Sequence, residues 1–137
     1  MDLEEEAVSA VTLSFVVDGK PQCKQRARRG KSRSQGGKGG RWYTPRETVV
    51  YENTISAAAL AAMAVAGIGR RYPGWVSASV HCYFPDAHRR DVDNVLKAVL
   101  DGMKDVVYAD DYQVRGATVT KAIDRERPRT EVEVTYG

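Results

Sequence analysis

The hydrophobic period of the sequence changes at Pro85, and this change constrains the fold more than any other feature. Before Pro85, apolar and polar residues alternate from Trp75 to Phe84, which predicts a strand with one buried face. After a short polar turn, apolar residues recur with helical spacing, which predicts a helix with one face in the core. The two core faces contain Val76, Ala78, Val80, Cys82 and Phe84 on the strand, and Val92, Val95, Leu96, Val99, Leu100 and Met103 on the helix.

Further elements are predicted on both sides of this pair. A β-branched and aromatic run predicts a first strand from Val11 to Val17. An Ala-rich stretch predicts a long helix from Pro45 to Ala66. Two more strands are expected, from Gln113 to Ile123 and from Thr130 to Tyr136. The predicted fold class is therefore α/β (α+β), a small mixed β-sheet with two helices packed on it, in the order β-α-β-α-β-β and with a long basic loop after the first strand.

The long helix carries start and stop signals. Thr44 can cap its first free N–H groups, and Pro45 suits the first helical position. Glu47 can reach back to Thr44 and close a capping box. Gly67 is expected to end the helix.

The composition is that of one soluble domain. The 137 residues suffice for a single core, so we expect one domain over residues 1–137. Hydrophobic residues make up 42%, aromatic residues 8% and charged residues 28%, which excludes collagenous, disordered and membrane classes. The richest apolar run, from Ile55 to Ile68, is too short for a spanning helix, so no membrane partner is expected. Cys23 and Cys82 are expected to be reduced thiols, since they lack any metal-type spacing.

Residues 1–10 are expected to form an acidic N-terminal tail. Four of the first six residues are acidic, which is the wrong sign for a secretory or transit peptide. A cytoplasmic location, as a cytosolic or a nucleoid-associated protein, is therefore expected.

The net charge of +3 is the sum of two unlike parts. Ten of the 21 basic residues lie between Gly19 and Arg46, where there is no acid, so this segment carries +10 and the rest of the chain −7. Glycines and a lack of aliphatic residues predict a flexible basic arm over residues 19–43. Such asymmetry indicates a polyanionic partner, although a solvated linker is the alternative. The candidate DNA contacts of the arm are Lys24, Arg26, Arg28, Arg29, Lys31, Arg33 and Arg41.

Two acids lie at the start of the second helix. The helix dipole and free N–H groups there stabilise carboxylates such as Asp91 and Asp93 by about 0.3–1 kcal/mol each. Lys97 lies four residues after Asp93, hence on the same face. In one interpretation an acid is the helix cap and Asp93 forms an ordinary ion pair with Lys97. In the other, these three side chains belong to a functional site.

A second acidic pair, Asp110 and Asp111, follows the same helix. Clustered carboxylates repel one another unless a cation compensates them, so the two pairs together suggest a divalent cation. Oxygen ligands without suitably spaced His or Cys favour Mg²⁺ or Mn²⁺ over Zn²⁺. Nucleases use such ions to activate water and to stabilise charge on the scissile phosphate. The alternative for Asp110 and Asp111 is a solvated turn.

Several separately spaced motifs resemble the RusA family of Holliday junction resolvases. The family pattern is a basic pair, D-x-D-N-x-x-K, an Asp within the helix, and D-D-x-Q-V after it. The resemblance is firm from Val76 to Lys121 and looser through Gly19, Lys24 and Tyr43. The matching positions are Arg89, Arg90, Asp91, Asp93, Asn94, Lys97, Asp101, Asp110, Asp111, Gln113 and Val114.

This resemblance implies a homodimeric endonuclease that cuts four-way DNA junctions with paired symmetric nicks, using Mg²⁺ or Mn²⁺ and no organic cofactor. Asp91, Asp93 and Asp111 would be the catalytic carboxylates that bind the metal, and Lys97 the essential lysine. Asp110 and Asp101 are supporting candidates. Arg89 and Arg90 would contact the phosphate backbone near the cut. A bacterial or phage-infected cell would be the setting.

Two other functions stay open on the sequence alone. The same metal site could act on other branched DNA, such as flaps or replication forks. Alternatively, the chain could be a noncatalytic DNA-binding phage accessory protein whose acids are only helix caps.

Other notable side chains have less specific interpretations. His81 and His88 have no matched ligand partner, so we do not expect them to bind metal. Trp42 and Tyr43 could stack on unpaired bases or could anchor the arm to the body. Trp75 is expected in packing or in a dimer interface.

Overall fold

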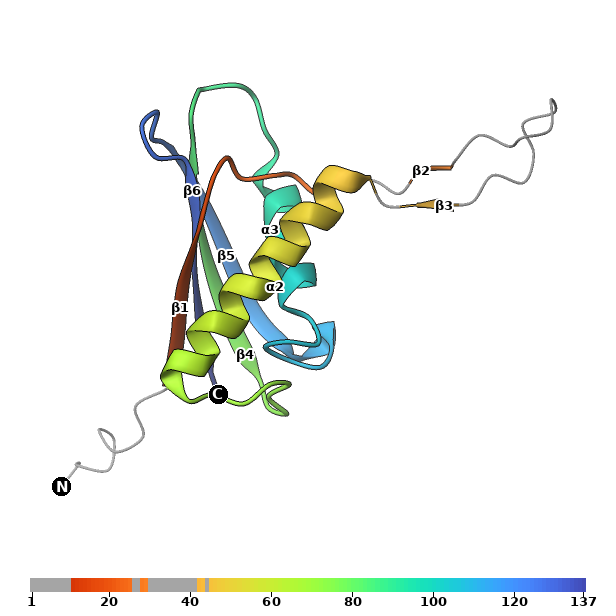
Figure 1. The fold of residues 1–137 in the computed structure, drawn as a ribbon, viewed down its shortest axis with the longest axis vertical. Helices are drawn as coiled ribbons and strands as arrows, with labels where there is room; N and C mark the ends of the chain where they lie inside the picture. The colour runs from red at the N-terminus through yellow and green to blue at the C-terminus, as the bar shows by residue number, and fades with distance from the viewer. Residues whose placement is uncertain (1–10, 26–27, 30–41, 44) are drawn as a thin grey trace.

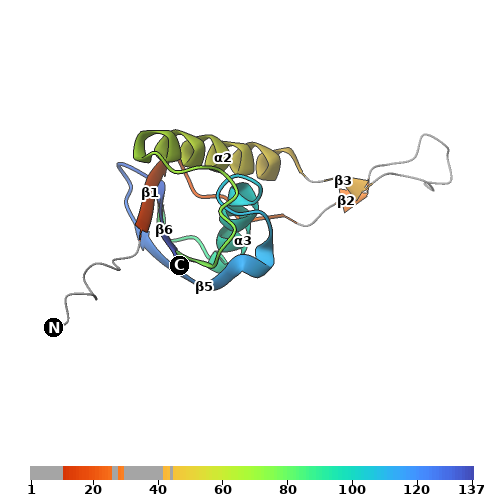
Figure 2. The same ribbon diagram turned by 90° about the horizontal axis from the view of Figure 1, so that it is seen from below.

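A computed structural model describes residues 11–25, 28–29, 42–43 and 45–137. Its main sheet has the strand order β1-β6-β4-β5, and two helices cover one face of it (Figures 1 and 2). β6 pairs antiparallel with both β1 and β4, whereas β4 and β5 are parallel. The elements are β1 (Val11–Asp18), β2 (Arg28–Arg29), β3 (Trp42–Tyr43), α2 (Arg46–Ala66), β4 (Val76–Phe84), α3 (Val92–Met103), a 3₁₀ helix η1 (Asp111–Gln113), β5 (Val114–Ile123) and β6 (Arg129–Tyr136). The predicted mixed sheet with two helices, in the order β-α-β-α-β-β, is confirmed.

The core lies between the sheet and the helices, as the periodicity predicts. Alternate residues of β1, β4 and β6 are buried, and the other side chains of these strands face away from the helices. Cys82 is buried in this core, which confirms its predicted position. The helices contribute Tyr51, Ile55, Ala59, Met63, Val95, Ala98, Val99 and Met103.

Three local predictions need correction. The N-cap of α2 is Pro45, so this residue precedes the helix instead of taking its first position. The predicted capping box depends on Thr44, which lies outside the described residues. Gln113 belongs to η1 rather than to β5, because the chain makes a 3₁₀ turn before it enters the sheet. The basic arm is not wholly a loop, since β2 and β3 pair within it and lie away from the main sheet (Figure 1).

α2 is a core helix, although its length and composition resemble those of a membrane-spanning segment. Its most apolar window has a mean hydropathy of 1.4. One face nevertheless packs against β1 and α3. Its predicted end is confirmed, since Gly67 is the C-cap in the left-handed conformation with φ 71°.

α2 and α3 cross closely at Gly102. A Cβ atom at Gly102 would lie 2.7 Å from Cβ of Ile55 and 2.9 Å from the carbonyl oxygen of Glu52. At the same crossing the Ser56 hydroxyl donates a hydrogen bond of 2.5 Å to the Gly102 carbonyl. Gly102 therefore sets how closely the helix that carries the acids approaches its neighbour.

Gly102→Ala should destabilise the protein by about 1–3 kcal/mol, because the added methyl group overpacks this crossing. Gly69→Ala is the matched control, since a Cβ there meets nothing within 4 Å. Urea unfolding followed by circular dichroism measures both. Equal unfolding midpoints for the two variants would contradict the close crossing.

Candidate functional site

The first turn of α3 presents Asp91 and Asp93 to solvent. Asp91 is the N-cap, and its Oδ1 accepts a hydrogen bond of 3.1 Å from the backbone N–H of Asp93. Both residues are exposed. The cap interpretation is thus confirmed for Asp91, but capping uses only one of its oxygens. A second oxygen remains for another ligand.

Lys97 does not form the ordinary ion pair that its spacing allows. Lys97 is exposed, and within the described part of the chain it pairs with neither Asp93 nor any other acid. The predicted Asp93–Lys97 surface pair is therefore wrong. The ammonium group is available to an anion from outside the protein.

Asp110 and Asp111 lie on a turn that Gln113 holds in place. Asp110 caps η1, with Oδ1 accepting from the backbone N–H of Asp111 at 2.7 Å. Gln113 is buried, and its Oε1 accepts from the N–H groups of Ala109 at 2.8 Å and Asp110 at 2.9 Å. Its Nε2 donates to the carbonyls of Tyr72 at 2.6 Å and Gly74 at 2.9 Å. The Gln of this motif thus fixes the loop that carries the acids.

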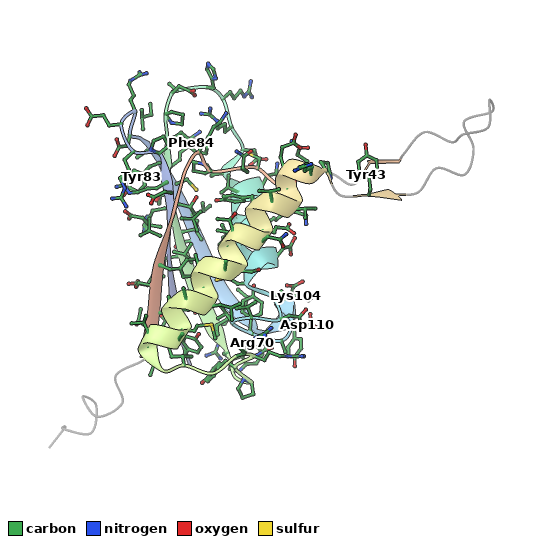
Figure 3. All side chains as sticks on the ribbon, viewed as in Figure 1. Tyr43, Arg70, Tyr83, Phe84, Lys104 and Asp110 are labelled. Atoms are coloured by element: carbon green, nitrogen blue, oxygen red, sulfur yellow. The ribbon has the colours of Figure 1, made fainter. Side chains whose placement is uncertain are left out.

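The two acidic pairs lie at opposite ends of α3. The helix has 12 residues, and at 1.5 Å per residue such a helix spans about 18 Å. Asp110 lies beside Lys104, just beyond the end of α3, with 3.7 Å between Lys104 Nζ and its Oδ1 (Figure 3). Among the described residues, no three His, Cys, Asp or Glu side chains gather closely enough to hold a metal ion. One chain does not assemble the expected cluster.

The basic pair before α3 divides into two different environments. The Arg90 guanidinium lies 4.4 Å above the Phe84 ring and pairs with Asp86 at 2.7 Å, so its side chain is only 10% exposed. This hydrogen bond, with a second from the His88 N–H, lowers the pKa of Asp86. Arg89 is exposed and makes no ion pair among the described residues. Arg90 thus shapes the turn, whereas the Arg89 side chain is exposed to solvent.

A pocket of about 390 Å³ opens beside this turn, between it and the end of β5. Lys121 of β5 lines the pocket, and its Nζ donates a hydrogen bond of 3.4 Å to the Arg90 carbonyl. The end of β5 therefore lies next to the start of α3.

The root of the basic arm packs against both helices. The Cys23 thiol donates to the Asp91 carbonyl at 3.7 Å, and burial and the nearby Asp91 carboxylate raise its pKa. The Lys24 N–H donates to the Asn94 carbonyl at 2.8 Å. Lys24 Nζ lies 2.8 Å from Glu52 Oε2 and 2.7 Å from Asp101 Oδ2. This part of the arm is a strap across α2 and α3.

Of the other predicted DNA contacts, few lie within the described residues. Arg28 and Arg29 form β2, opposite Tyr43 and Trp42 of β3. The remaining ones, Arg26, Lys31, Arg33 and Arg41, lie outside the described residues.

The structure adds two residues that the sequence analysis did not single out. Asp86 could have been found from its i, i+4 spacing to Arg90. Glu52 carried no such signal, because its partner Lys24 is 28 residues away and belongs to another element.

The fold and these groups define a small α+β domain with solvent-facing acids on a helix and a cationic strap beside them. Residues 18–135 match the family described as Endodeoxyribonuclease RusA. Because the match covers most of the chain, the protein belongs to the RusA endodeoxyribonuclease family, as the motifs indicate. No curated protein sequence matches the chain.

Gln113→Met should destabilise the protein by about 1–3 kcal/mol, because it removes the partners of buried backbone groups. Hydrogen exchange at Ala109 and Asp110 should accelerate most, since their N–H groups lose their acceptor. Tyr112→Ala is the matched control in the same 3₁₀ helix, as Tyr112 is 72% exposed. Unchanged exchange in Gln113→Met would contradict the anchoring role.

Proposed function

We propose that the protein is a structure-selective endonuclease that resolves four-way DNA junctions by paired symmetric nicks, in recombination and repair. The observation that carries this proposal is the face of α3, where Asp91, Asp93 and Lys97 reach solvent on a helix of a RusA-family domain. The setting would be the cytoplasm of a bacterial or phage-infected cell.

Mg²⁺ or Mn²⁺ would be the metal, since the available donors are all carboxylate oxygens. Asp91, Asp93 and Asp111 would hold it, with Asp110 in support. The bound ion would activate water and offset charge on the scissile phosphate. Lys97 makes no ion pair among the described residues. It would contact the scissile phosphate and stabilise the negative charge that develops there during cleavage.

A homodimer is the simplest way to bring the two acidic pairs together. β5 is an edge strand of the sheet, and eight of its ten residues are exposed. A long exposed edge strand is a template for pairing with another chain. Antiparallel pairing of two β5 strands would place the start of one strand beside the end of the other.

This arrangement would complete the site from two protomers. β5 begins just after Asp111, and its other end lies near Arg90 through the Lys121 hydrogen bond. Asp111 of one protomer would therefore approach Asp91 and Asp93 of the other. Two-fold symmetry would give two identical sites, which suits a junction that is itself approximately two-fold symmetric.

The cationic groups would bind the DNA backbone. The acidic surface would repel DNA unless the arm, with Arg89, displaced condensed counterions from the phosphates. Each neutralised phosphate contributes about −0.9 to the slope of log K against log salt. Binding should accordingly weaken steeply as salt concentration rises.

Asp91→Asn should abolish cleavage while junction binding persists. Asn caps helices as well as Asp does, so the fold should be retained. Cleavage of a synthetic four-way junction in Mg²⁺ should fall roughly 100-fold or more, the scale of losing one transition-state-stabilising group. Electrophoretic mobility shifts at fixed salt concentration measure junction binding. Nicking by Asp91→Asn at the wild-type rate would contradict the proposed mechanism.

The same assay separates the alternative functions. Labelled flaps, forks and four-way junctions, compared side by side, distinguish a junction resolvase from a nuclease of other branched DNA. Binding without cleavage of any substrate, in Mg²⁺ or in Mn²⁺, would leave only the noncatalytic accessory protein.

Asp91→Asn and Asp111→Asn chains should complement each other in a mixed dimer. If each site takes Asp91 from one protomer and Asp111 from the other, one of the two sites in the mixed dimer is intact. Co-expression with two different tags allows the mixed dimer to be purified. Nicking should reappear there but not in either homodimer, and an inactive mixed dimer would mean that the site lies within one chain.

A further inference from the structure

Lys24 holds two carboxylates that belong to different helices. Glu52 of α2 and Asp101 of α3 both lie within hydrogen-bond distance of its Nζ, at 2.8 and 2.7 Å. Their side chains are 21% and 36% exposed, and that of Lys24 is 30% exposed. Partial burial alone would lower the pKa of Lys24, but the hydrogen bonds to Asp101 and Glu52 raise it above its usual value. Lys24 is thus protonated and committed to this cluster.

Asp101 has a second potential partner on its own helix. Lys97 is four residues before it, and residues with this spacing are neighbours on a helix surface. Lys97 nevertheless pairs with no acid among the described residues. Lys24 occupies the Asp101 carboxylate, so this acid is not available to Lys97.

We propose that Lys24 is a positioning residue, which by binding Asp101 and Glu52 keeps Lys97 unpaired and available to the DNA phosphate. This inference rests on the proposed function for the role of Lys97 and on the observed ion pairs for the rest. Without Lys24, two partly buried carboxylates would lack their cation, and Lys97, the one lysine of α3, lies four residues from Asp101. The positive charge that the reaction needs would then be bound within the protein.

The test is a double-mutant cycle of Lys24→Met and Asp101→Asn, with a readout that needs no DNA. Acylation of Lys97 by an amine-specific reagent, quantified by mass spectrometry, reports whether its ammonium group is paired. Labelling of Lys97 should slow about threefold or more in Lys24→Met, since an exposed helical pair alone gives about twofold and these carboxylates are partly buried. It should return when Lys24→Met is combined with Asp101→Asn, and Lys24→Arg should label as the wild type does.

Cleavage under single-turnover conditions should follow the same pattern. At protein concentrations that saturate the DNA, Lys24→Met should slow cleavage about threefold or more when Asp101 is present, and by less when added to Asp101→Asn. A lysine that only stabilised the fold would change melting temperature without this dependence on Asp101. Equal Lys97 labelling in wild type and Lys24→Met, or equal cleavage losses in both backgrounds, would overturn the proposal.

Failure of the proposed function would look different. In that case the wild-type protein would cleave no branched DNA, while the labelling of Lys97 would still respond to Lys24→Met. The two proposals can therefore fail separately.

Discussion

The length of α3 is the constraint on which the rest of the site depends. β4 and β5 are parallel neighbours, and parallel strands require a crossover rather than a tight turn. The crossover is α3, which returns the chain from the end of one strand to the start of the next. Residues before and after such a helix are held apart by its length, and no group of three acids gathers among the described residues. The proposed dimer would supply the missing acid from its second protomer.

The acids also serve the local structure, and this double use shapes their chemistry. Asp91 and Asp110 each accept a backbone N–H hydrogen bond at the start of a helix. These bonds fix the side-chain direction and leave one carboxylate oxygen of each acid outside the cap. Asp91 makes no ion pair among the described residues and Asp110 lies 3.7 Å from Lys104, whereas the charge of Asp86 is offset by Arg90 at 2.7 Å. These remaining oxygens are the ones that would serve the proposed metal ion.

Much of the fold was predictable because its signals are local. The alternation before Pro85 and the helical spacing after it identified β4 and α3 to within one residue. The site was only partly predictable. The sequence motif contains both Asp91 and Asp111, but it does not give the distance between their side chains in the folded chain. The link from Lys24 to Glu52 and Asp101 joins three separate elements. No period or spacing in the sequence encodes a contact of that kind.

The structure also changes which basic residues count as available to a DNA backbone. By sequence, Lys24 and Arg90 belong to the cations that a DNA backbone would attract. By geometry, both neutralise carboxylates of their own chain, at 2.7–2.8 Å and 2.7 Å respectively. Arg89 and Lys97 make no ion pair among the described residues. In the sequence, one precedes and the other follows Asp91 and Asp93 at the start of α3. The cations available to a phosphate are those that form no ion pair within the protein. Which cations these are depends on which carboxylates the other cations bind.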